Sequence, residues 1–226
     1  MWRLDKSPGA DVALFTFGSF TNPGRQEPSY AFVNTVLRLK KAFGASFDSY
    51  YLTARKNDWY FSGVQGCNSL EASFAEIERA MASYDATMFL GNSMGGYAAM
   101  LFGAPLKADA ILAFSPQTRF DSAFCEQIGE SRWRDAYIEM RAQHDVEAMA
   151  LHSRWPNTYD GSVDIHFGAG CGQDKEYAAQ LSGMSGVSLV PHEGLDHDLV
   201  HDLRATKTLD EIIWNGLQNL DTKSAK

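Results

Sequence analysis

The residues with the clearest potential for chemistry are Gly91-Asn92-Ser93-Met94-Gly95, which match the pattern G-x-S-x-G. An apolar run at residues 86–90 predicts a strand directly before this motif, and residues 94–102 predict a helix directly after it. At so tight a turn, glycines leave room for backbone that side chains would block, and the serine projects outward. The pattern favours Ser93 as a nucleophile over a helix-capping serine, because free N–H groups at a helix start suit a developing oxyanion.

A serine hydroxyl is a weak nucleophile until a base removes its proton, so this motif needs a histidine and a carboxylate farther along the chain. Residues 163–167 predict a strand that ends in a glycine-rich turn bearing Asp174. Residues 187–190 predict a strand followed by a loop bearing His197. Because parallel strands end at one edge of a sheet, we expect Ser93, Asp174 and His197 to meet there, with the carboxylate accepting the histidine N–H.

Other residues compete for the roles of base and acid. The alternative bases are His192, which is nearer the strand end, and His201, which lies about one helical turn beyond His197. The alternative acids are Asp121, Asp160, Asp164 and Asp196. His197 is favoured because it follows its strand by a loop of the expected length, and Asp174 is favoured over Asp164 because the latter lies within a predicted strand.

A metal site is a further hypothesis, since His197 and His201 are spaced to share one face of a helix. The H-E-x-x-H zinc motif needs a glutamate where this chain has Asp198, and the sequence offers no clear third ligand. No CxxC pair occurs among the cysteines, which are Cys67, Cys125 and Cys171. We therefore expect no metal, no cofactor and no disulfide framework, and the separated thiols fit a reducing compartment.

The elements that must position these residues alternate between short apolar runs and helical patterns, which is typical of a parallel sheet flanked by helices. Further strands are predicted at residues 12–17, 49–53 and 110–114, and further helices at 32–43, 70–84 and 209–220. Residues 119–160 break this alternation with a charged helical stretch, interpreted as a lid insertion. Its Trp133 and Trp155 are candidates for lining a substrate pocket.

Composition limits the classes of partner. The chain has 226 residues, of which 45% are hydrophobic, and this length favours one domain spanning residues 1–226. Its formal net charge of -8 leaves no broad basic field for nucleic acid or anionic lipid. The early apolar run at residues 12–17 is too short for a membrane span and lacks signal-peptide flanks, so we expect a cytoplasmic protein with no membrane partner.

On these residues the chain resembles the α/β-hydrolase superfamily, in particular its esterases and acyl hydrolases. The resemblance runs from Val12 to the C-terminal helix and rests on Gly91-Asn-Ser-Met-Gly-Gly96, Gly172-Gln-Asp174 and Gly194-Leu-Asp-His197. It implies a three-layer α/β/α sandwich with a mostly parallel sheet of about six strands, without the antiparallel strands that open the full fold. It also implies an oxyanion hole formed by the backbone N–H groups of Met94 and Ser19, where many members carry His-Gly instead of Phe17-Gly18-Ser19.

The sequence thus predicts a serine hydrolase that cleaves an ester-like bond of a small or medium substrate through an acyl-enzyme on Ser93. A thioesterase or an acyltransferase that uses the same three residues is an alternative, because transfer and hydrolysis differ only in what accepts the acyl group. A binding or accessory module that keeps the fold without turnover is a second alternative, since fold alone does not establish function.

Overall fold

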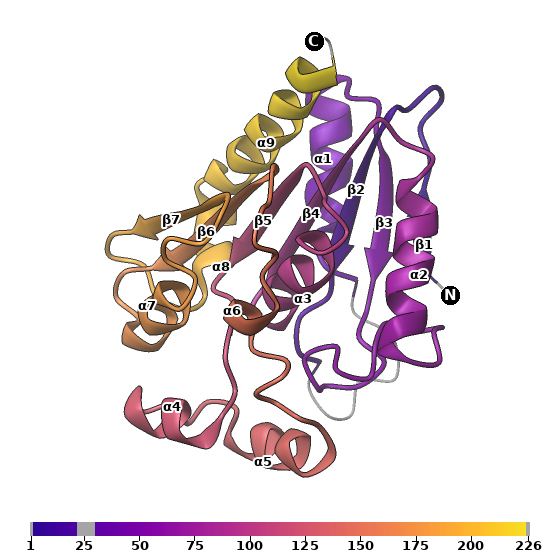
Figure 1. Cartoon of the computed structure of the whole chain (residues 1–226). Coiled ribbons are helices and arrows are strands. Elements are labelled where there is room, and N and C mark those ends of the chain that lie inside the picture. The colour runs from indigo at the N-terminus through magenta and orange to yellow at the C-terminus, as the bar shows by residue number, and fades with distance from the viewer. Residues whose placement is uncertain (1, 22–29, 225–226) are drawn as a thin grey trace.

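Seven strands form one sheet in the part of the chain that the computed structural model describes, residues 2–21 and 30–224 (Figure 1). Their order across the sheet is β1-β3-β2-β4-β5-β6-β7. The strands are β1 (Arg3–Asp5), β2 (Val12–Phe17), β3 (Asp48–Leu52), β4 (Ala86–Asn92), β5 (Ala110–Phe114), β6 (Ser162–Gly168) and β7 (Val187–His192). Strands β2 to β7 run parallel to one another, and β1 pairs antiparallel with β3.

Strand β1 corrects the expectation that antiparallel opening strands are missing. It pairs Arg3 with Tyr51 and Asp5 with Ser49 at the edge of the sheet. Arg3 and Leu4 are exposed, so this strand carries no apolar run by which the sequence could reveal it. Within the described residues, the parallel strands β2 to β7 agree with the sheet of about six strands that the sequence predicts.

Helices cover both faces of the sheet and complete the predicted three-layer α/β sandwich (Figure 1). The helices are α1 (Val33–Phe43), α2 (Leu70–Met81), α3 (Met94–Gly103), α4 (Ser122–Gln127), α5 (Arg134–Gln143), α6 (Leu151–Arg154), α7 (Gly172–Ala179), α8 (Leu199–Ala205) and α9 (Thr208–Ser224). Helices α2, α3 and α7 pack on one face, and α1, α8 and α9 pack on the other. Because both faces are covered, the central strands β4 and β5 are apolar along almost their whole length.

Residues 119–160, called the insertion below, lie between β5 and β6 and contain helices α4, α5 and α6. In Figure 1, α4 and α5 stand beyond the carboxyl edge of the sheet, apart from the helical layers. The insertion is joined to the body of the protein by aromatic packing, in which the ring of Trp59 lies 4.7 Å from that of Tyr137 and 6.0 Å from that of Trp133. The insertion therefore stands at the edge where the predicted site residues gather.

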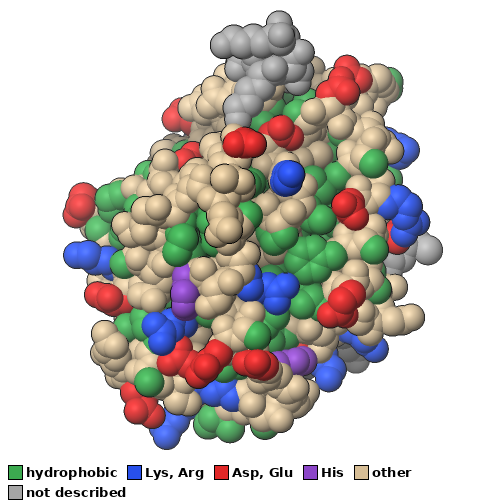
Figure 2. Space-filling model, in the orientation of Figure 1, with side chains coloured by type: hydrophobic (Ala, Val, Ile, Leu, Met, Phe, Trp, Pro, Cys, Tyr) green, Lys and Arg blue, Asp and Glu red, His purple; other side chains and the backbone are tan. Residues whose placement is uncertain are grey.

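The surface shows no single-sign field on the face drawn in Figure 2, where acidic and basic side chains are interspersed. Among the described helices, none is long and apolar enough to cross a bilayer.

Candidate active site

Ser93 sits at the sharp turn between β4 and α3, with a φ of 52° and a ψ of -121°. A positive φ is rare for a residue with a side chain, so the surrounding backbone must hold Ser93 in place. A Cβ atom on Gly91 would lie 1.9 Å from the carbonyl oxygen of Gly95, and one on Gly95 would lie 2.3 Å from that of Phe17. Both motif glycines are thus required by close backbone contact, which is the reason that the sequence pattern predicts.

The structure brings Ser93, His197 and Asp174 together. The Oγ atom of Ser93 lies 3.4 Å from Nε2 of His197. On the other side of the ring, Nδ1 of His197 lies 2.7 Å from Oδ2 and 3.0 Å from Oδ1 of Asp174. Contacts in this row suit a nucleophile, a base and an orienting acid, because Nδ1–H can donate to the carboxylate while Nε2 accepts from the hydroxyl.

Burial and charge keep the acid ionised. Asp174 is fully buried, and burial on its own would raise the pKa of this carboxyl. The hydrogen bonds and charges of His197 and Arg132 outweigh that effect and hold the pKa of Asp174 below its usual value. An ionised Asp174 can therefore fix the tautomer of His197 and stabilise an imidazolium.

The two amides expected in the oxyanion hole lie at the ends of neighbouring strands, β2 and β4. The N–H of Gly18 donates to the carbonyl of Leu52 at 2.9 Å, whereas those of Ser19 and Met94 donate to no acceptor within the described residues. The hydroxyl of Ser19 donates to the carbonyl of Asn92 at 2.8 Å and joins the two strand ends. The assignment of Ser19 and Met94 to an oxyanion hole is compatible with these contacts and stays a prediction.

Gln117 is a neighbour of Ser93 that the sequence analysis missed. Its Oε1 lies 3.3 Å from the Oγ of Ser93 and accepts from Trp59 Nε1 at 2.9 Å, while its Nε2 donates to the carbonyl of Ser115. The single hydroxyl proton of Ser93 can therefore be donated either to Gln117 or to His197. The side chain is fully buried, so its orientation is fixed. Its position just after β5, at the same sheet edge as the other site residues, is the only signal that could have suggested it.

The insertion contributes two further residues: Arg132, which no sequence pattern singled out, and Trp133, a predicted candidate for the pocket wall. The guanidinium of Arg132 donates from Nη1 to Oδ1 of Asp174 at 2.9 Å. The ring of Trp133 meets that of His197 edge to face at 6.2 Å and that of Phe20 at 5.1 Å. Trp133 thus lies beside the reacting residues, as its candidacy for a pocket wall requires, while Trp155 bonds to the carbonyl of Ser185 instead.

The alternative bases and acids occupy other places. His192 contacts His166 at 3.0 Å, and His201 is exposed on α8. Asp121 caps α4 by accepting from the N–H of Phe124, and burial within β6 raises the pKa of Asp164. In the described part of the chain, no cluster of three or more His, Cys, Asp or Glu side chains could hold a metal ion. His197 precedes α8, so it does not share a helix face with His201.

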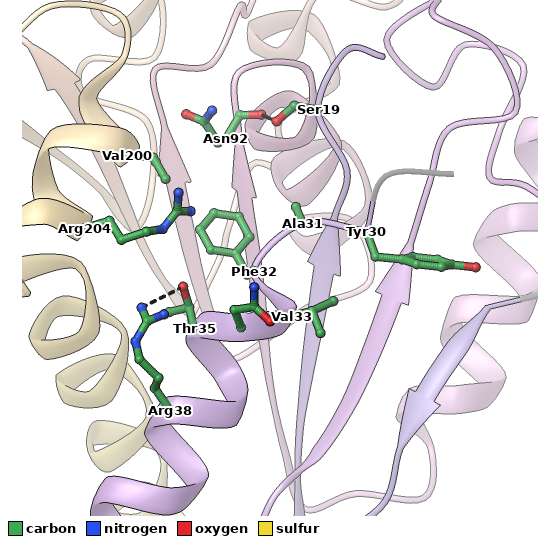
Figure 3. A pocket seen from close by; sticks show the side chains of 11 residues that line it. Ser19, Tyr30, Ala31, Phe32, Val33, Thr35, Arg38, Asn92, Val200 and Arg204 are labelled. Atoms are coloured by element: carbon green, nitrogen blue, oxygen red, sulfur yellow. Dashed lines mark hydrogen bonds between the residues drawn. The ribbon is translucent and has the colours of Figure 1, made fainter. Parts of the chain in front are cut away.

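A cavity of about 340 Å³ opens behind the serine turn, between the start of α1 and α8 (Figure 3). Ser19 and Asn92 line it at the strand ends, and Arg38 and Arg204 line it farther out. Arg38 is already paired with Asp210 through two hydrogen bonds. Neither Ser93 nor His197 lines this cavity, so it lies apart from the atoms placed to react.

The sequence matches no family model and no curated protein. Among solved structures, it is similar to an esterase/lipase from an uncultured bacterium (13% identity, TM-score 0.65, 100% of this chain and 82% of that chain). It is also similar to Est1E from Butyrivibrio proteoclasticus (14%, 0.58, 96% and 94%) and to the capsule O-acetyltransferase of Neisseria meningitidis serogroup A (12%, 0.58, 93% and 90%). The chain therefore has the α/β-hydrolase fold, which confirms the fold that the resemblance of its motifs implies.

Proposed function

We propose that this protein is a serine hydrolase that cleaves ester-like bonds through an acyl-enzyme on Ser93. The observation that carries the proposal is the continuous row of contacts from Ser93 Oγ to His197 Nε2 and from His197 Nδ1 to Asp174. The strained conformation of Ser93 supports it further, since strain of this kind persists where the surrounding structure enforces it, and such residues cluster at active sites.

In the first half of the reaction, Ser93 Oγ attacks the carbonyl carbon of the ester while Nε2 of His197 takes the hydroxyl proton. The N–H groups of Met94 and Ser19 stabilise the negative charge on the carbonyl oxygen. His197 then gives its proton to the leaving alcohol, and the acyl group stays on Ser93. In the second half, His197 takes a proton from a water molecule, whose oxygen attacks the acyl carbon. The bond from that carbon to Ser93 Oγ then breaks, His197 returns the proton to Oγ, and the acid leaves, so the protein ends unchanged without a cofactor.

A small or medium ester is the substrate class that the site supports. Phe20 and Trp133, which pack on the buried Trp59, form an aromatic surface beside His197 that can pack against an acyl chain or a ring. Two similar solved structures hold small carboxylic acids: ferulic acid in Est1E and butyrate in the esterase Est2 from Thermogutta terrifontis. Esters of such acids are therefore suitable first substrates.

Acyl transfer is the second candidate, favoured by the likeness to the capsule O-acetyltransferase. The acyl-enzyme would be the same, and an alcohol in place of water would receive the acyl group from Ser93. Release of the acid in water alone supports hydrolysis, whereas ester formation with an added alcohol, faster than release of the acid, supports transfer.

The proposal is tested by labelling the folded protein with a fluorophosphonate, which reacts with activated serines. We expect one adduct on the peptide that contains Ser93, and its loss in Ser93→Ala and His197→Ala variants that keep the wild-type circular dichroism spectrum. Hydrolysis of p-nitrophenyl acetate should fall in both variants by a factor on the order of a thousand or more. A folded wild-type protein that takes no label and releases no acid would favour the non-catalytic binding module.

A further inference from the structure

The insertion reaches the acid of the site through one buried chain of charges. Arg132 lies between two carboxylates, with Nη1 donating to Oδ1 of Asp174 and Nε donating to both oxygens of Glu130 at 3.0 and 3.1 Å. The side chains of Glu130 and Asp174 are fully buried, and that of Arg132 is one quarter exposed. All three charges are thus largely withdrawn from water, where their mutual effects are strong.

We propose that Arg132 and Glu130 are positioning residues for the catalytic acid, which is an inference that rests on the proposed function. Arg132 fixes the carboxylate of Asp174, and Glu130 neutralises Arg132 so that His197 faces a net negative charge. Neither residue is placed to touch the substrate; both act through Asp174.

The positioning role follows from how the two oxygens of Asp174 are shared. Arg132 donates to Oδ1, and the shorter contact of His197 is to Oδ2. Rotation of the carboxylate would break this charge-assisted hydrogen bond, so the contact favours the orientation in which Asp174 faces His197. Arg132 is itself held, because its backbone N–H also donates to Oε1 of Glu130 at 2.8 Å.

The charge role follows from counting the neighbours of His197. Asp174 with Arg132 alone would carry no net charge, and an imidazolium beside such a pair would gain little stabilisation. Glu130 restores a net charge of minus one to the group of three. Arg132 and Glu130 both lie in the short turn between α4 and α5, so the insertion carries the cation and its counter-charge together.

The test compares the pH dependence of fluorophosphonate labelling in the full-length wild type and in Glu130→Gln. His197 must be neutral to act as a base, so labelling falls on the acid side as it becomes protonated. Without the charge of Glu130, an imidazolium beside Asp174 is less stabilised, so the fall in labelling should begin at a lower pH. We expect the acid limb of the profile, the pH range in which the labelling rate falls, to move down by roughly half to one pH unit. The maximal labelling rate should drop about tenfold.

The Glu130→Gln, Arg132→Gln double variant separates charge from geometry. Its Asp174 again carries a net charge of minus one, so the acid limb should return close to the wild-type position. The maximal rate should stay about tenfold low, since Asp174 has lost the contact that favours its orientation. In this variant the buried carboxylate of Asp174 has lost its cation and keeps only the bond to His197, so its fold is checked by circular dichroism. Glu130→Gln keeps the Arg132–Asp174 pair and tests the charge role even where the double variant fails to fold.

Glu126→Gln is the matched control, because it removes the same charge from an exposed side chain on α4. It should leave the limb and the rate unchanged. If the acid limb of the labelling profile lies at the same pH in Glu130→Gln as in Glu126→Gln, the inference is overturned while the proposed function stands. The same holds if the double variant labels at the wild-type rate. A wild-type protein that takes no label on Ser93 overturns the proposed function, and this inference with it.

Discussion

Ser93 is held in its positive φ by the backbones that cross beside it. Gly91, Gly95 and Phe17 come so close that no side chain fits on the two glycines. The carbonyl of Phe114 also accepts the N–H of Ser93 at 2.8 Å, which fixes the turn from the side of β5. The conformation that aims the hydroxyl at His197 is therefore imposed by three strand ends together.

Replacement of Gly91 by alanine tests this at the scale of one methyl group. The new Cβ would meet Gly95 O at 1.9 Å, so β4 or α3 must shift. We expect Gly91→Ala to lose about 3 kcal/mol or more of unfolding free energy, measured by urea denaturation, and to lose labelling of Ser93. Gly172→Ala is the control, since its Cβ meets nothing within 4 Å, and it should change stability by less than about 1 kcal/mol. Equal losses in both variants would contradict the argument.

A site residue could be predicted where a local sequence motif marks it. The G-x-S-x-G pattern marks Ser93, and a loop after a strand marks Asp174 and His197; the three side chains lie within hydrogen-bond distance of one another in a row. Gln117 and Arg132 have no such mark. Their contacts depend on how a strand end and an insertion pack in three dimensions, and polar residues in irregular segments are usually solvated.

At the scale of elements, the question is which strand delivers the acid. The sequence left two edges open, because Asp121 follows β5 and Asp174 follows β6. The structure places Asp174 at the histidine, while Asp121 accepts from the first turn of α4 and pairs with Arg119. An aspartate that caps a helix has its carboxylate oriented by that helix, away from a second role.

We therefore expect opposite results from two asparagine variants. Asp174→Asn keeps the size of the side chain but removes the charge that orients His197, and labelling of Ser93 should slow by a factor on the order of a thousand to ten thousand. Asp121→Asn should label within about twofold of the wild type, because asparagine also caps helices well. Rates are compared at pH 7.5 by gel fluorescence. If Asp121→Asn slows labelling and Asp174→Asn does not, the acid of the site is Asp121, which follows β5.

Elements with both faces buried were the most predictable from sequence. Strands β2, β4 and β5 show continuous apolar runs because helices cover them on both sides. Strand β1 was missed because its pairing is decided by the free edge of β3 and not by its own residues. The charged pattern of residues 119–160 predicted helices there, but the contacts of this segment with Asp174 and His197 could not follow from helical periodicity.

For the molecule as a whole, the burial of His166 makes the free energy of unfolding depend on pH. Burial, with a smaller effect of His192, lowers the pKa of His166 to about 4. His166, on β6, stacks on Phe114 of the neighbouring strand β5, and its Nδ1 lies 3.0 Å from Nε2 of His192. Because the unfolded chain binds a proton at this histidine near pH 6.5 and the folded protein does not, acid favours unfolding between these two values.

The free energy of unfolding should be highest above pH 6.5 and should fall by roughly 3 kcal/mol toward pH 4 through His166 alone. Global charge repulsion cannot cause this loss at first, since the net charge of -8 shrinks toward zero as the pH nears the pI of about 5.2. Nor can Asp174, whose lowered pKa removes stability only in stronger acid. Urea denaturation at pH 7.5, 6.5, 5.5 and 4.5 measures the slope, which His166→Phe should flatten and His201→Gln, at an exposed site, should not. An unchanged slope in His166→Phe would place the acid sensitivity elsewhere.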